Sequence, residues 1–213
     1  MDIVWLGHAC FLIRGKERTI ITDPYHPDLG YSLGEPKADI ALLSHDHPGH
    51  SYAEGVAGEP RVIRSPGEYE IGGPFITAVA SFHDDSKGEA RGKNTIYVVE
   101  IDGVTLCHLG DLGHPLSAHL VEELGDVDIL LVPVGELNTI SVDVAVETIR
   151  QLEPAIVIPM HYKTEAVAAN LSPVDQFLEK TRARETETRP KLSVSSSSLP
   201  VSTQVVVLSY QPA

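Results

Sequence analysis

The segment with the clearest chemical potential is residues 44–50, Ser-His-Asp-His-Pro-Gly-His, which follows an apolar run at residues 38–43. It places three imidazoles, those of His45, His47 and His50, in one short stretch. Histidine is the commonest side-chain ligand for zinc and similar metals. A buried strand that ends in a Pro-Gly turn projects such side chains into a cleft from a rigid base. The segment therefore predicts a metal site at the end of a strand.

Four further metal-capable side chains stand at the ends of other apolar runs, and they are Asp23, His83, Asp111 and His161. A single imidazole or carboxylate in that position is more often structural than a ligand. Four of them beside a His-x-His-x-x-His segment favour one shared metal centre.

Composition sets the class of protein. A chain of 213 residues with 42% hydrophobic residues is expected to form a single domain, residues 1–213, with a sizeable core. Its 16 basic and 30 acidic residues give a net charge of -14, which argues against a nucleic-acid partner. Cys10 and Cys107 lie in apolar runs, and no leader or membrane-spanning stretch is visible. We therefore expect a cytoplasmic protein that does not bind membranes.

Short apolar segments dominate the first half of the chain and predict paired strands at residues 2–6, 10–14, 19–22, 38–43, 61–65, 75–82, 95–101 and 104–109. The Asp102-Gly103 pair predicts a tight hairpin between the last two. In the second half of the chain, predicted helices alternate with predicted strands. Helices are expected at residues 117–124, 141–152 and 173–182, and strands at 129–132, 155–159 and 204–209. Residues 184–198 are polar and serine-rich and predict a loop. This order indicates a layered α/β architecture with a mixed sheet.

The order of these residues resembles that of metallo-β-lactamase-fold hydrolases. The matching phrases are Gly7-His8, Asp23-Pro24, residues 44–50, His83, Gly110-Asp111 and Pro159-Met160-His161-Tyr162. Residues 108–114 and 158–162 are typical of a small bacterial branch that includes ascorbate-6-phosphate lactonase-like proteins. The resemblance implies an αββα sandwich, in which two mixed sheets carry helices outside.

The resemblance also implies a set of metal ligands. One ion would be bound by His45, His47 and His83, a second by His50 and His161, and Asp111 would bridge the two. Asp23 would accept a hydrogen bond from the N–H of a ligand imidazole and so fix the orientation of that ring. Asp46 would support the ligands in the same way. The alternative for Asp23 is an ordinary turn carboxylate before Pro24.

Gly49 is the departure from the family pattern. The superfamily has His-x-His-x-Asp-His, and its aspartate is a ligand of the second metal, whereas glycine offers no donor. We therefore expect the second ion to be held less tightly than the first. Asp46, Asp84 and Asp85 are candidates for a substitute carboxylate.

The implied activity is hydrolysis of an ester, lactone or phosphoester bond of a small molecule by metal-bound hydroxide. Asp111 would position the water or move its proton. His8 would orient the substrate or stabilise the oxyanion, unless it is a hydrogen-bonded structural residue of the turn after Gly7. The expected cofactor is one or two divalent ions, with zinc first and manganese, iron or nickel also compatible. The resemblance favours a homo-oligomer.

Two other functions stay open. The first is a non-catalytic member that binds a metal or metabolite, and Gly49 is the feature that supports it. The second is a nuclease, which the net charge disfavours.

Overall fold

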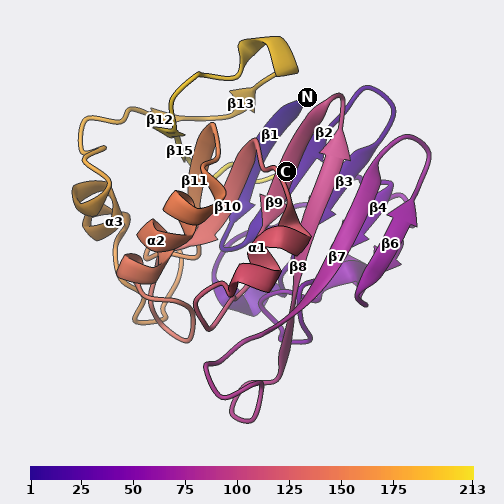
Figure 1. The fold of residues 1–213 in the computed structure, drawn as a ribbon. Helices are drawn as coiled ribbons and strands as arrows, with labels where there is room; N and C mark the ends of the chain where they lie inside the picture. Colours follow the sequence, from indigo (N-terminus) through magenta and orange to yellow (C-terminus); the bar gives the residue numbers. More distant parts are fainter.

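Two mixed β-sheets form the body of the protein in the computed structural model, which describes all 213 residues (Figure 1). The six-stranded sheet has the order β13-β1-β2-β3-β4-β5. Its strands are β1 Asp2–Gly7, β2 Cys10–Arg14, β3 Thr19–Thr22, β4 Ile40–Leu42, β5 Arg61–Ile63 and β13 Leu192–Ser193. Strands β1, β2 and β3 form the predicted antiparallel meander, and β3, β4 and β5 are parallel.

The seven-stranded sheet has the order β14-β11-β10-β9-β8-β7-β6. Its strands are β6 Gly67–Glu70, β7 Phe75–Phe82, β8 Lys93–Ile101, β9 Val104–His108, β10 Ile129–Pro133, β11 Ile156–Met160 and β14 Gln204–Val205. Strands β6 to β9 are antiparallel, and β9, β10, β11 and β14 are parallel. The hairpin between β8 and β9 turns at Asp102 and Gly103, whose φ angles of 55° and 75° suit a type I′ turn.

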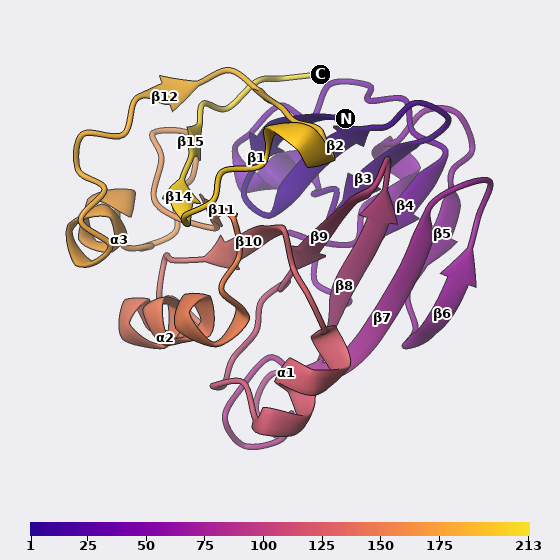
Figure 2. The ribbon, with the colours of Figure 1, turned by 45° about the horizontal axis from the view of Figure 1, so that its top comes forward.

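Three helices flank the seven-stranded sheet, α1 Ala118–Leu124, α2 Val142–Leu152 and α3 Val174–Lys180. Figure 1 shows α1 and α2 in front of this sheet, and Figure 2 shows α3 beside α2. The hydroxyls of Ser117 and Ser141 accept hydrogen bonds from the first turns of α1 and α2 and so fix where these helices begin. None of the helices combines the length and the apolar character that crossing a membrane requires.

The six-stranded sheet is covered on its outer face by a loop rather than by an α-helix. Trp5 and Phe11 point into the main core, while the alternating Leu6 and Leu12 belong to a second apolar cluster. In that cluster they are joined by Tyr25, Tyr31 and Leu33 of the segment between β3 and β4. The predicted α/β class with two mixed sheets is confirmed, and on this side a tyrosine-rich loop takes the place of helices.

Three local predictions from sequence were wrong. Residues 184–198 contain β12 Thr188–Arg189, β13 and a 3₁₀ turn at Ser196–Ser198, because Leu192 is buried where β13 pairs with β1. Strand β6 was missed, because its Gly-Glu-Tyr-Glu sequence is polar and lies at the sheet edge. The predicted strand at 204–209 is divided into two strands. β14 pairs with β11 in the seven-stranded sheet, whereas β15 Val207–Leu208 pairs with β12 in a separate two-stranded sheet.

Candidate metal centre

The candidate ligands all follow the carboxyl ends of strands that run in the same direction within each sheet. His8, Asp23 and residues 44–50 follow β1, β3 and β4. His83, Asp111 and His161 follow β7, β9 and β11 in the other sheet. Because co-directional strands end at the same edge, the topology gathers these side chains at one end of the sandwich.

One group of imidazoles consists of His45, His47 and His83. One ring nitrogen of each lies within 4.8 Å of the others. His83 is buried and His47 is exposed, so the group lies at the border between core and solvent. Borderline metals bind such nitrogens, and this is the ligand set that the resemblance implied for the first ion.

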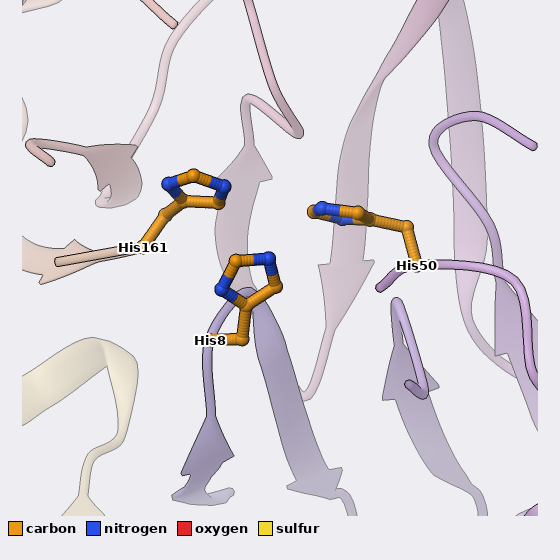
Figure 3. A group of neighbouring side chains, drawn as sticks. All are labelled: His8, His50 and His161. Atoms are coloured by element: carbon orange, nitrogen blue, oxygen red, sulfur yellow. The ribbon is translucent and has the colours of Figure 1, made fainter. Parts of the chain in front are cut away.

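A second group consists of His8, His50 and His161, which likewise offer nitrogens within 4.8 Å of one another. Figure 3 shows the ring of His8 between those of His50 and His161. All three residues are buried. The structure therefore places the ring of His8 beside the pair of histidines that was expected for the second ion.

Asp111 lies between the two groups. Its Oδ2 is 3.3 Å from the Nε2 atoms of both His50 and His161, and 3.4 Å from that of His83. The Nε2 of His45 is 3.8 Å away. A single carboxylate oxygen thus faces imidazoles of both groups, as a bridging ligand must.

Asp23 is completely buried and is hydrogen-bonded to one of the candidate ligands, as predicted for a supporting carboxylate. Its Oδ1 accepts a hydrogen bond from Ser44 N at 2.7 Å. Its Oδ2 accepts from Ser44 Oγ at 2.6 Å and from His50 Nδ1 at 2.9 Å. Because Asp23 accepts from Nδ1, Nε2 is the nitrogen of His50 that faces Asp111. A simple turn carboxylate would not make these contacts.

Burial and neighbouring charges shift the pKa values in this cluster. Burial and His50 lower the pKa of His45 to about 3, and burial also lowers the pKa of His83. Burial works against the charged form of His50, but Asp111 and Asp23 outweigh it and raise the pKa of His50 to about 10. Burial likewise opposes the charged form of Asp111, yet His161 and His50 hold its pKa well below the ordinary value. In the absence of a metal, the cluster therefore combines the neutral imidazoles of His45 and His83 with a charged His50 and an ionised Asp111.

Unsatisfied polar atoms are concentrated in this cluster, and this observation tests whether it fits a metal. Eight buried side-chain atoms in the chain have no hydrogen-bond partner. Five of them belong to the site: His8 Nδ1, His45 Nε2, His83 Nδ1, Asp111 Oδ1 and His161 Nδ1. Because buried polar atoms are nearly always paired, this concentration of nitrogen and oxygen donors fits a bound divalent cation.

Two positioning residues were not found from the sequence. Ser44 Oγ lies 2.9 Å from His45 Nδ1 and so links this ligand to Asp23. Asn94, at the start of β8, accepts from Asp111 N at 3.0 Å and donates to Leu109 O at 2.9 Å, which fixes the turn that carries Asp111. Ser44 adjoins the histidine segment and offered a signal, whereas Asn94 is distant in sequence and offered none.

The carboxylates considered as substitutes for the missing aspartate do not reach the imidazoles. Asp46 is exposed and lies 3.9 Å from Arg64, so the prediction that it supports the ligands was wrong. Asp84 accepts hydrogen bonds from four backbone N–H groups, those of residues 86, 88, 90 and 91. Asp85 accepts from the Ser86 hydroxyl.

A polar cavity of about 620 Å³ opens beside the first group of imidazoles. His45 and His47 form part of its lining, together with the cationic side chains of Arg64, Arg91 and Lys93. Arg64 is close to Asp46, but Arg91 and Lys93 take part in no ion pair. In a chain of net charge -14, this is a local concentration of positive charge next to the candidate ligands.

Asp84 fixes the conformation of the loop on one side of this cavity, because its carboxylate accepts hydrogen bonds from backbone N–H groups of residues 86–91. These backbone hydrogen bonds lower the pKa of Asp84 below its ordinary 3.8, although burial acts in the opposite direction. The stabilisation is therefore present above about pH 4 and is lost as the pH falls through the lowered pKa. We expect amide protection at residues 86–91 to show that acid transition in hydrogen exchange. Above about pH 4, Asp84→Asn should weaken protection to the level that the wild type shows in acid, while leaving metal content unchanged. Equal protection in wild type and variant above that pH would contradict this role.

The absence of a side chain at Gly135 allows the backbone of the turn that carries His161 to pack directly against the backbone of Gly135. A Cβ atom at position 135 would lie 2.0 Å from His161 O. We expect Gly135→Ala to displace His161, to lower the free energy of unfolding by about 1–3 kcal/mol and to reduce metal content. Gly125→Ala is the control, because a Cβ there meets nothing within 4 Å, although its φ of 64° also carries strain. Unchanged metal content in Gly135→Ala would refute the prediction.

The comparisons with known proteins agree with this geometry. Residues 2–161 match the family described as the beta-lactamase superfamily domain, a span that contains every candidate ligand. A UPF0173 metal-dependent hydrolase of Methanoculleus marisnigri is 30% identical over 207 residues, covering 85% of this chain and 90% of its own. Another, from Carboxydothermus hydrogenoformans, is 31% identical and covers 86% and 93%. A crystallised Thermotoga maritima protein of the metallo-β-lactamase superfamily is 40% identical, with a TM-score of 0.80 and 97% coverage of both chains.

Proposed function

The chain belongs to the beta-lactamase superfamily and is a metal-dependent hydrolase, and on that premise we propose that it cleaves an ester, lactone or phosphoester bond of a small anionic molecule. The observation that carries the proposal is the cationic cavity, which adjoins His45 and His47. It supplies a place for the charge of a substrate next to the residues that would hold a metal.

The proposed metal ligands are His45, His47 and His83 for one ion and His50 and His161 for a second, with Asp111 between them. A divalent ion bound there supplies a Lewis acid that activates water and polarises the bond to be cleaved. We propose zinc, since nitrogen-rich sites suit it, with manganese, iron and nickel as the alternatives.

Asp111 has two tasks in this proposal. Its Oδ2 faces the imidazoles of both groups, and its Oδ1 is buried without a partner. As a carboxylate that faces both groups, Asp111 would also help to position the attacking water. Asp23 and Ser44 hold the rings of His50 and His45 in place and take no direct part in the reaction.

The test is to reload the metal-stripped protein with zinc, manganese, iron or nickel and to assay chromogenic esters, lactones and phosphoesters. We expect turnover of an anionic substrate by the loaded protein and its loss on chelation. If the loaded protein binds metal but hydrolyses none of these bonds, the non-catalytic alternative that Gly49 suggested replaces this proposal.

Arg91 and Lys93 provide a second, more local test. We expect Arg91→Ala or Lys93→Ala to raise KM for an anionic substrate roughly 10-fold, because a charge-assisted hydrogen bond contributes about 1.5 kcal/mol. The kcat should change little, and KM for a neutral ester should not change. Lys87→Ala is the matched control, since Lys87 lies in the same loop but does not line the cavity. Equal effects of these variants on neutral and anionic substrates would exclude charge recognition.

A further inference from the structure

Gly49 leaves a space next to the second group of imidazoles, and the ring of His8 occupies it. A Cβ atom at position 49 would point at this ring, 3.3 Å from His8 Nε2 and 3.5 Å from His8 Cδ2. Gly49 does not have a positive φ, so its backbone would accept a side chain. The imidazole of His8 thus lies where a side chain at position 49 would extend.

The backbone of His8 is held in an uncommon conformation. Its φ is 53°, in the left-handed region that non-glycine residues rarely adopt. The carbonyl oxygen of His8 accepts hydrogen bonds from His161 N at 3.0 Å and from Trp5 Nε1 at 2.9 Å. His161 has a φ of 54°. Paired strain of this kind persists where surrounding structure over-determines it and is concentrated at functional sites.

The side chain of His8 is positioned as a ligand. It is 6% exposed, and its Nδ1 has no hydrogen-bond partner. The ring centroid lies 4.1 Å from that of His161 and 4.8 Å from that of His50 (Figure 3). A structural histidine would satisfy its buried nitrogen within the protein.

We propose that His8 is a metal ligand that takes the place left by Gly49, so that the second ion is held by His8, His50, His161 and the bridging Asp111. The proposal rests on the metal-dependent function proposed above. It replaces the expected role of His8 as a substrate or oxyanion residue. The site is then complete with three imidazole nitrogens and one carboxylate, and it no longer needs a carboxylate from the His45 to His50 segment.

The exchange of a carboxylate for an imidazole changes which ion is preferred. Imidazole ligands suit zinc, cobalt and nickel, whereas carboxylates favour manganese and magnesium. The second site should therefore bind Co²⁺ tightly and Mn²⁺ weakly.

The test counts ions and does not depend on turnover. Metal-stripped full-length protein is titrated with Co²⁺, and stoichiometry and dissociation constants are read from visible absorption and mass spectrometry. We expect two ions per chain in the wild type. His8→Phe keeps a ring against His161 but has no nitrogen, and it should bind the first ion normally and the second roughly 10-fold more weakly or not at all. Normal binding of the first ion shows that the variant is folded. His119→Ala on exposed α1 is the matched control and should bind both ions.

A rescue variant makes the inference specific to position 49. In His8→Ala/Gly49→Asp the new carboxylate points into the space left by the ring, and we expect two ions again, with a raised affinity for Mn²⁺. Two ions bound with wild-type affinity by His8→Phe, or a single ion bound by the wild type, would overturn the proposal. If the variants behave as expected but no substrate is hydrolysed, only the proposed function fails.

Discussion

Asp111→Asn is expected to reduce kcat by roughly 10²- to 10³-fold and to lower the number of ions bound per chain. The amide has the same shape as the carboxylate but carries no charge. It therefore cannot supply one anionic oxygen to imidazole groups whose Nε2 atoms lie 3.3 and 3.4 Å from Asp111 Oδ2. Metal content by mass spectrometry and kcat with a saturating ion together measure the effect.

The control for Asp111 is Asp46→Asn. Asp46 lies beside the ligands in sequence, but its side chain is exposed and lies near Arg64. We expect metal content and kcat within about twofold of the wild type, because an exposed ion pair contributes little. If Asp111→Asn also retained both ions and its turnover, the two groups of imidazoles would not form a joint centre.

Asp23→Ala is expected to cost about 3–5 kcal/mol of unfolding free energy, because it removes one partner from a buried, charged network. The side chain is 0% exposed, and its loss leaves Ser44 N, Ser44 Oγ and His50 Nδ1 without an acceptor. Denaturant unfolding of the metal-stripped protein measures this cost. Asp39→Ala is the comparison, since this exposed carboxylate also accepts a backbone N–H, from Thr19, and should cost about 1 kcal/mol.

Asp23→Asn separates stability from positioning. The amide can still accept from Ser44 N, so the loss of stability should be smaller than with alanine. It no longer fixes which nitrogen of His50 carries the proton, and we expect ion affinity to fall about 10- to 100-fold. An unchanged affinity in Asp23→Asn would mean that Asp23 is only a structural residue.

Most of the fold could be predicted from the pattern of apolar residues. The meander, the Asp102-Gly103 hairpin and the capped helix at residues 141–152 carry local signals, and the structure places elements there. The errors fall where local signals are weak. Strand β13 is two residues long and is held by pairing with β1, and strand β6 is polar and lies at an edge. Whether such segments form strands depends on pairing with distant parts of the chain and not on their local strand propensity.

The sequence by itself determined the chemical types at the site and their order, because ligand-type residues follow strand after strand. It also determined that position 49 has no donor. Only the tertiary structure decided what fills that position. His8 is far from Gly49 in sequence, and it reaches Gly49 because β1 and β4 end at the same edge of one sheet. Spacing along a chain cannot reveal a contact that depends on the direction of two separate strands, whereas the sheet fixes it.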